Sequence, residues 1–135
     1  MAISGLIAVQ SSFGARETLD RFEAAIKARG MTVFARIDHA AGASAVGLTL
    51  RPTDLLIFGN PKTGTALMLA AQTSGIDLPL KALAYQDDAG TTWLAYNDPK
   101  WIADRHGLSV PAAAAAEPMA AALSALVKQA TQADA

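Results

Sequence analysis

Apolar and polar positions at the start of the chain follow two different periods. In Ile3–Gln10 and Met31–Ile37 the apolar residues are spaced for a strand with one buried face. Between Ala15 and Arg29 they recur three and four positions apart, as in an amphipathic helix, and Gly30 supplies a left-handed stop. The pattern therefore predicts a strand, a helix and a second strand, in that order.

In the middle of the chain a short apolar strand, a turn and a helix follow one another directly. Asp54–Phe58 is the predicted strand, the turn is rich in Gly, Asn and Pro, and the helix begins at Lys62 or Thr63 and runs through Gln72. Upstream, the small residues after Asp38 predict one or two helical turns with Asp38 as the N-cap. This stretch organises the rest of the chain.

A hairpin and a short helix follow. Lys81–Gln86 and Thr91–Tyr96 flank a polar turn that ends in glycine, which is a hairpin signal. Asp98 is placed as an N-cap and Pro99 as the first helical residue, where its missing N–H costs nothing. The sequence thus predicts more strands than helices in the body of the chain.

The tail beyond residue 110 is rich in alanine, which favours helix. An apolar stripe predicts a terminal helix from Pro118 to about Gln129, and Thr131–Ala135 is expected to fray. We interpret residues 1–110 as one domain and residues 111–135 as a helical extension packed on it.

These elements predict an α+β fold, with an antiparallel sheet and helices packed on one face. The second face of the sheet is a candidate for dimerisation or ligand binding, because bulky aromatic residues fall on predicted strands. The alternative is that these side chains belong to the core. They are Phe34, Tyr85, Trp93 and Tyr96.

Composition narrows the class of protein. The chain has 135 residues, enough for one domain with a sizeable core, and its hydrophobic fraction of 52% owes much to alanine. The longest apolar stretches are interrupted well before the length of about 18 residues that a membrane span needs, so we expect a soluble protein with no membrane partner. The net charge of −1 and pI near 6.0 disfavour nucleic acid. The absence of cysteine excludes disulfides and thiolate chemistry, and the first residues lack a basic leader, which favours the cytoplasm.

Several motifs together resemble domain-of-unknown-function family 302. They are Leu50–Thr53, Leu55–Lys62, Gly64-Thr65, Gly75–Lys81 and Tyr96–Pro99, and the Phe-Gly-Asn-Pro-Lys string is specific. The resemblance covers about residues 5–108 and leaves the tail outside. It implies a small α+β domain with a fold like the repeat unit of the TATA-binding protein, in cytosolic bacterial proteins that form homodimers. It implies no substrate, cofactor or catalytic residue, and a shared fold does not imply DNA binding.

The turn after the central strand is a candidate ligand site. A helix N-terminus offers free N–H groups and a favourable dipole to an anion. A small anionic molecule would be held by the turn, by Lys62 and by the neighbouring cation Arg51; the full predicted set is Gly59, Asn60, Lys62, Thr63, Gly64, Thr65 and Arg51. Arg51 could instead pair with Asp54. The alternative for the turn is purely structural, a tight corner whose Thr side chains cap the helix.

His39 is the second candidate, because the small residues after it leave space beside the ring. It is a candidate general base, or part of a capped turn beside Asp38. His106 fits a positive charge at a helix C-terminus and needs no further role. The two histidines lie far apart in the sequence and lack the spacing of metal ligands, so they do not indicate a metal site.

Three hypotheses follow. The first is a homodimeric module that binds a small molecule near Gly59–Thr65, with His39 lining the same pocket. The second is a small enzyme in which His39 is the general base. The third is a structural or dimerisation domain without a ligand.

Overall fold

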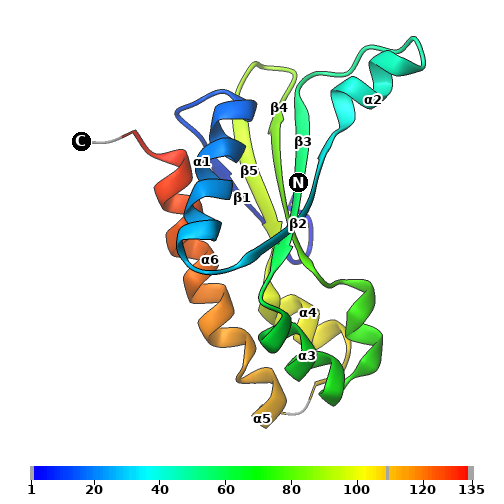
Figure 1. Cartoon of the computed structure of the whole chain (residues 1–135), viewed down its shortest axis with the longest axis vertical. Coiled ribbons are helices and arrows are strands. Elements are labelled where there is room, and N and C mark those ends of the chain that lie inside the picture. The colour runs from blue at the N-terminus through cyan, green and yellow to red at the C-terminus, as the bar shows by residue number, and fades with distance from the viewer. Residues whose placement is uncertain (1, 109, 134–135) are drawn as a thin grey trace.

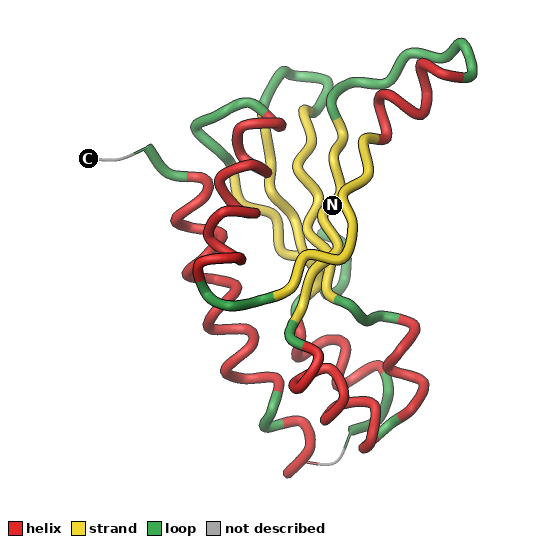
Figure 2. The backbone as a smooth tube through the Cα atoms, viewed as in Figure 1, coloured by secondary structure: helices red, strands yellow, loops and turns green. Residues whose placement is uncertain are grey.

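The computed structural model describes residues 2–108 and 110–133, and these build a five-stranded antiparallel sheet with helices (Figures 1 and 2). The predicted α+β class is confirmed. The strands are β1 (Leu6–Gln10), β2 (Thr32–Asp38), β3 (Thr53–Gly59), β4 (Leu80–Gln86) and β5 (Thr92–Asn97). The helices are α1 (Ala15–Ala28), α2 (His39–Ala45), α3 (Pro61–Ala70), the 3-10 helix η1 (Gln72–Ile76), α4 (Pro99–Arg105), α5 (Val110–Ala113) and α6 (Ala116–Thr131).

The strand order is β1-β5-β4-β3-β2, and each neighbouring pair is antiparallel. The predicted hairpin is therefore β4–β5, near the centre of the sheet. The first strand and the second lie at opposite edges, so α1 crosses the sheet between them (Figure 1). Helices α3, η1, α4 and α5 gather at one end of the sheet, and α2 projects from the other (Figure 1).

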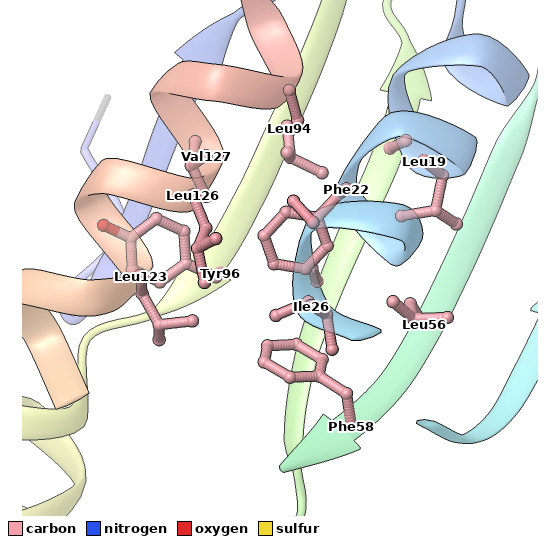
Figure 3. Close-up of a cluster of buried hydrophobic side chains, with 14 of the residues drawn as sticks. Leu19, Phe22, Ile26, Leu56, Phe58, Leu94, Tyr96, Leu123, Leu126 and Val127 are labelled. Atoms are coloured by element: carbon pink, nitrogen blue, oxygen red, sulfur yellow. The ribbon is translucent and has the colours of Figure 1, made fainter. Parts of the chain in front are cut away.

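The core lies between the sheet and the pair α1 and α6, which run side by side over one face (Figures 1 and 3). Phe22 of α1 and Phe58 of β3 are fully buried and meet edge to face, with ring centroids 5.2 Å apart. Tyr96 also belongs to this core and is 4% exposed, so for this side chain the core alternative holds and the second face does not. Since successive side chains in β5 point to opposite faces, Trp93 lies on the second face.

The second face of the sheet carries half-buried apolar side chains. Leu55 and Ile57 of β3 alternate with buried residues, as do Leu83 and Tyr85 of β4. Phe34 lies at a bulge in the edge strand β2 and is 50% exposed. We call Leu55, Ile57, Leu83, Tyr85 and Trp93 the open face.

The ends of two helices, α6 and α3, differ from the prediction. Thr131 is fully buried in the last turn of α6, its hydroxyl donates to the Val127 carbonyl at 2.8 Å, and its carbonyl accepts from the Ser12 N–H at 2.8 Å. The expected fraying at Thr131 is therefore wrong; residues 134–135 lie outside the described residues. Helix α3 begins at Pro61 and ends at Ala70, earlier than predicted, and η1 replaces its last turn.

Residues Val110–Thr131 are long and apolar enough to cross a membrane by length and composition alone. This amends the expectation that every apolar stretch is too short. Alanine raises the hydropathy of the segment, and its larger side chains Leu123, Leu126 and Val127 pack into the core of the domain (Figure 3). A single such helix is weak evidence for a span.

Candidate functional site

The predicted turn forms one wall of a pocket at the corner between β3 and α3. This corner pocket has a volume of about 210 Å³. It is lined by Phe34, Gly59, Asn60, Pro61, Gly64, Thr65, Met68, Leu78, Pro79, Leu80 and Met119. The structure therefore brings together Gly59, Asn60, Gly64 and Thr65 from the predicted set. Carbon and sulfur atoms supply most of the remaining wall, so the environment is largely apolar.

The N-terminus of α3 has few donors left for an anion. Pro61 occupies the first helical position and has no N–H. The Lys62 N–H donates to Asn60 Oδ1 at 3.0 Å, and the Gly64 N–H donates to the Asn60 carbonyl at 2.9 Å. Of the N–H groups in this first turn, only that of Thr63 has no acceptor among the described residues. Self-capping by Asn60 thus weakens the anion hypothesis, which rested on free N–H groups at this helix end.

The charged residues of the predicted set lie away from the corner pocket. Lys62 is exposed and lines none of the three cavities found in the described part of the chain. Thr63 lines a neighbouring cavity of about 260 Å³. Arg51 lies at the other end of β3, where its Nε donates to the Gln86 carbonyl at 3.2 Å. Arg51 forms no ion pair with Asp54 among the described residues; Arg36 Nη2 instead lies 3.5 Å from Asp54 Oδ2.

His39 does not share a pocket with the turn. It is the exposed first residue of α2, capped by Asp38, whose carboxylate accepts from the Ala41 N–H at 2.9 Å. Asp38 pairs with Asp54 in the sheet, whereas Gly59 pairs with Thr32 at the other end of β3. The rise of a strand, about 3.4 Å per residue, puts roughly 17 Å of β3 between the two sites. The predicted common pocket is therefore wrong.

His106 has partners that the sequence did not indicate. Its Nε2 lies 2.6 Å from Asp77 Oδ2, and its Nδ1 lies 2.9 Å from Thr73 Oγ1. Arg105 Nη1 donates to both oxygens of Asp77 at 2.8 Å. The imidazole is 8% exposed, so the cluster ties η1 firmly to α4. A hydroxyl, an imidazole and a carboxylate in series can activate a nucleophile, but none of the three cavities includes these residues.

The third of these cavities is a cleft of about 770 Å³ at the N-terminus of α1, at the opposite end of the sheet from the corner pocket. We call it the α1 cleft. It is lined by residues 10–17, by Asp38, Ala40, Pro52, Asp54 and Gln86, and by residues 90–92. No local signal in the sequence marks this cleft, because the residues that face residues 10–17 come from strands and loops far along the chain.

Comparison with known proteins places this fold. The family described as "Domain of unknown function DUF302" matches residues 7–126. The chain belongs to the DUF302 family. This match continues into the tail, beyond the limit of residue 108 that the motifs suggested. The "crystal structure of uncharacterized conserved protein DUF302 from Bacillus stearothermophilus" has a TM-score of 0.83 and 22% identity, and the match covers 95% of this chain and 99% of that chain. At this identity the likeness shows the fold of the DUF302 domain.

Longer proteins carry a similar sequence. This DUF302 chain is 51% identical over 107 residues to "Fluoride-specific ion channel FluC 1" of Brucella suis, across 79% of this chain and 42% of that protein. "Fluoride-specific ion channel FluC 2" of Brucella melitensis is also 51% identical over 107 residues, with 40% of its length covered. The chain therefore spans about two fifths of the length of these relatives.

Proposed function

We propose that this DUF302 chain is a module that binds a small, largely apolar molecule in the corner pocket. The observation that carries the proposal is the wall of the pocket, in which Phe34, Met68, Leu78, Pro79 and Met119 converge on the turn after β3. Ligand sites are concave and mostly apolar, with a few polar groups that fix orientation. A volume of about 210 Å³ suits a single ring system or a short chain.

Asn60 supplies the polar group. Its Oδ1 is occupied by the Lys62 N–H, whereas its amide nitrogen has no partner among the described residues. A ligand with one hydrogen-bond acceptor on an apolar body fits this arrangement, because a carboxylate or phosphate would lose hydration that the wall does not replace. The proposal thus keeps the predicted ligand site and replaces its anionic ligand.

Titration with indole, followed by isothermal calorimetry, tests this proposal. The full chain is expected to bind indole, and Gly64→Leu is expected to abolish binding by filling the pocket. Gly42→Leu is the matched control, because Gly42 lies in α2 with open space around it. Native mass spectrometry of freshly purified protein would show a retained ligand directly. Indole binding that survives Gly64→Leu would contradict the proposal.

We further propose that the module works as a homodimer in the cytoplasm, with a second copy against the open face. Support comes from exposed apolar residues beside it: Ile37 is 40% exposed, and Val46, Leu48 and Leu50 after α2 are 72%, 65% and 45% exposed. A projecting segment with such residues is costly in water and suits a partner surface.

Light scattering coupled to size exclusion tests the dimer. Leu83→Asp places a charge at the middle of the open face and is expected to give a monomer, whereas Ala121→Asp on the exposed side of α6 is the control for an added charge. A monomeric unaltered protein would refute the dimer. Cell fractionation tests the cytoplasmic location, and recovery with membranes would count against it.

The Brucella relatives favour a second candidate function, as a companion domain to a fluoride-specific channel. The match leaves more than half of each relative uncovered. An open sheet cannot line a bilayer, since its edges leave N–H and C=O groups unpaired. We therefore place the channel activity of those relatives in their uncovered part. Deleting the gene for this chain is expected to sensitise cells to fluoride, and unchanged growth on fluoride would rule this role out.

The enzyme hypothesis with His39 as general base gains no support. The ring is exposed, has no hydrogen-bond partner among the described residues, and lines none of the three cavities.

A further inference from the structure

We propose that the α1 cleft is a second binding site, for a small zwitterion that carries a carboxylate and an ammonium group, as α-amino acids do. The cleft lies at the end of the sheet away from the corner pocket, so this inference stands apart from the function proposed above. Its volume of about 770 Å³ lies within the range of small-molecule sites.

One end of the cleft offers backbone donors. Gly14 is the N-cap of α1 and provides no side-chain cap. Thr18 is the first residue of this helix whose N–H has a backbone acceptor, the Gly14 carbonyl at 2.9 Å. The N–H groups of Ala15, Arg16 and Glu17 therefore have no acceptor among the described residues. Together with the partial positive charge of the helix end, they can receive a carboxylate.

The unpartnered hydroxyl of a largely buried residue provides an independent indication of a ligand. Thr92 begins β5, is 8% exposed and lines the α1 cleft. Its carbonyl accepts from the Ser11 N–H at 2.8 Å, but its hydroxyl has no partner in the described part of the chain. The neighbouring Ser11 and Thr18 hydroxyls, by contrast, are bonded to each other at 2.6 Å. Polar side chains of largely buried residues normally have hydrogen-bond partners, so the accessible Thr92 hydroxyl is available to a molecule that enters the cleft.

The opposite wall is acidic. Asp54 is 8% exposed and has Arg36 Nη2 at 3.5 Å as its ion-pair partner, and Asp38 Oδ2 lies 3.8 Å from the Arg16 guanidinium. The charged residues that line the cleft are one arginine and three carboxylates, including Glu17. This excess of negative charge disfavours a simple anion and suits a molecule that presents an ammonium group to Asp54. Carboxylates and histidines do not converge as a metal site among the described residues.

The probes are the L-α-amino acids, tested one at a time with the full-length protein by calorimetry and by amide chemical shifts. At least one is expected to bind at millimolar concentration or below and to shift the amides of Ala15, Arg16 and Glu17. Its N-acetyl derivative lacks the ammonium group and its amide derivative lacks the carboxylate, so both are expected to bind at least about tenfold more weakly. This comparison needs no variant.

Two variants locate the ligand. Thr92→Val keeps the shape of the side chain and removes the hydroxyl, and it is expected to weaken binding about threefold to tenfold. Asp54→Asn is expected to reduce the preference for the free amine over the N-acetyl derivative. Thr32→Val is the matched control, because Thr32 is exposed at the far end of β2.

Three results would overturn the inference. The first is that no amino acid binds, and the second is that the N-acetyl derivative binds as well as the parent, which would indicate an anion site. The third is that Thr92→Val binds like the unaltered protein while the shifts map elsewhere.

Discussion

The Gly64→Ala variant is expected to raise the stability of the protein and to lower its affinity for a ligand in the corner pocket. Gly64 occupies the fourth position of α3, in an ordinary helical conformation. Alanine is favoured over glycine inside a helix by about 0.8–1 kcal/mol. A methyl group there would meet Leu78 Cδ1 and Met68 Cε at 4.0 Å, which is ordinary contact distance. The apo protein is therefore expected to gain stability.

The size of the gain can be estimated for a chain of 135 residues. With an unfolding entropy of about 2.1 cal/mol/K per residue, 1 kcal/mol corresponds to a Tm shift of roughly 3–4 °C. Differential scanning calorimetry measures this shift. Gly42→Ala is the control, because Gly42 is also the fourth residue of its helix, α2, and has open space around it.

Indole affinity should fall for the variant at position 64, whose Tm rises, and should stay unchanged for the variant at position 42. The methyl group at position 64 points among the side chains that line the corner pocket, so indole affinity is expected to fall by about 1–2 kcal/mol, or roughly fivefold to thirtyfold. Gly42→Ala should leave it unchanged. Two results would refute the reasoning: a lower Tm for Gly64→Ala, or a higher Tm with unaltered indole affinity.

Three further predictions concern other parts of the domain. The pKa of Asp87 is lowered chiefly by the hydrogen bond from the Trp93 indole, so this carboxylate stabilises the folded state above its usual pKa near 3.8, and the contribution disappears as pH falls through the lowered value. Urea midpoints should therefore show Asp87→Asn to be less stable at pH 7, with the difference closing in acid; a constant difference would contradict this. Phe58→Ala should cost about 3–5 kcal/mol in urea unfolding, because the ring is fully buried against Phe22, and a loss below about 1 kcal/mol would contradict that packing. Lys62→Ala should leave indole affinity unchanged, since Lys62 lines none of the three cavities, and a marked loss would return weight to the anionic ligand.

Local signals predicted most of the elements. Asp38 and Asp98 cap α2 and α4 as their positions in the sequence indicate, because an N-cap needs only a short polar side chain and the next few N–H groups. The hairpin β4–β5 followed from its turn residues for the same reason. Local signals failed where contacts from afar decide the outcome: Thr131 stays helical because Ser12 bonds to it.

The sequence by itself determined the fold class, the family and the corner between β3 and α3, since periodicity, capping and turn chemistry are encoded within a few residues. The tertiary structure decided the chemistry of the sites. It made the corner apolar by bringing Phe34 and Met119 against Asn60, and it separated His39 from that corner by the length of β3. It also joined His106 to Asp77, 29 positions away, and opened a cleft between α1 and the strand ends. A pocket is formed by residues distant in sequence, and their meeting depends on how the sheet and helices pack.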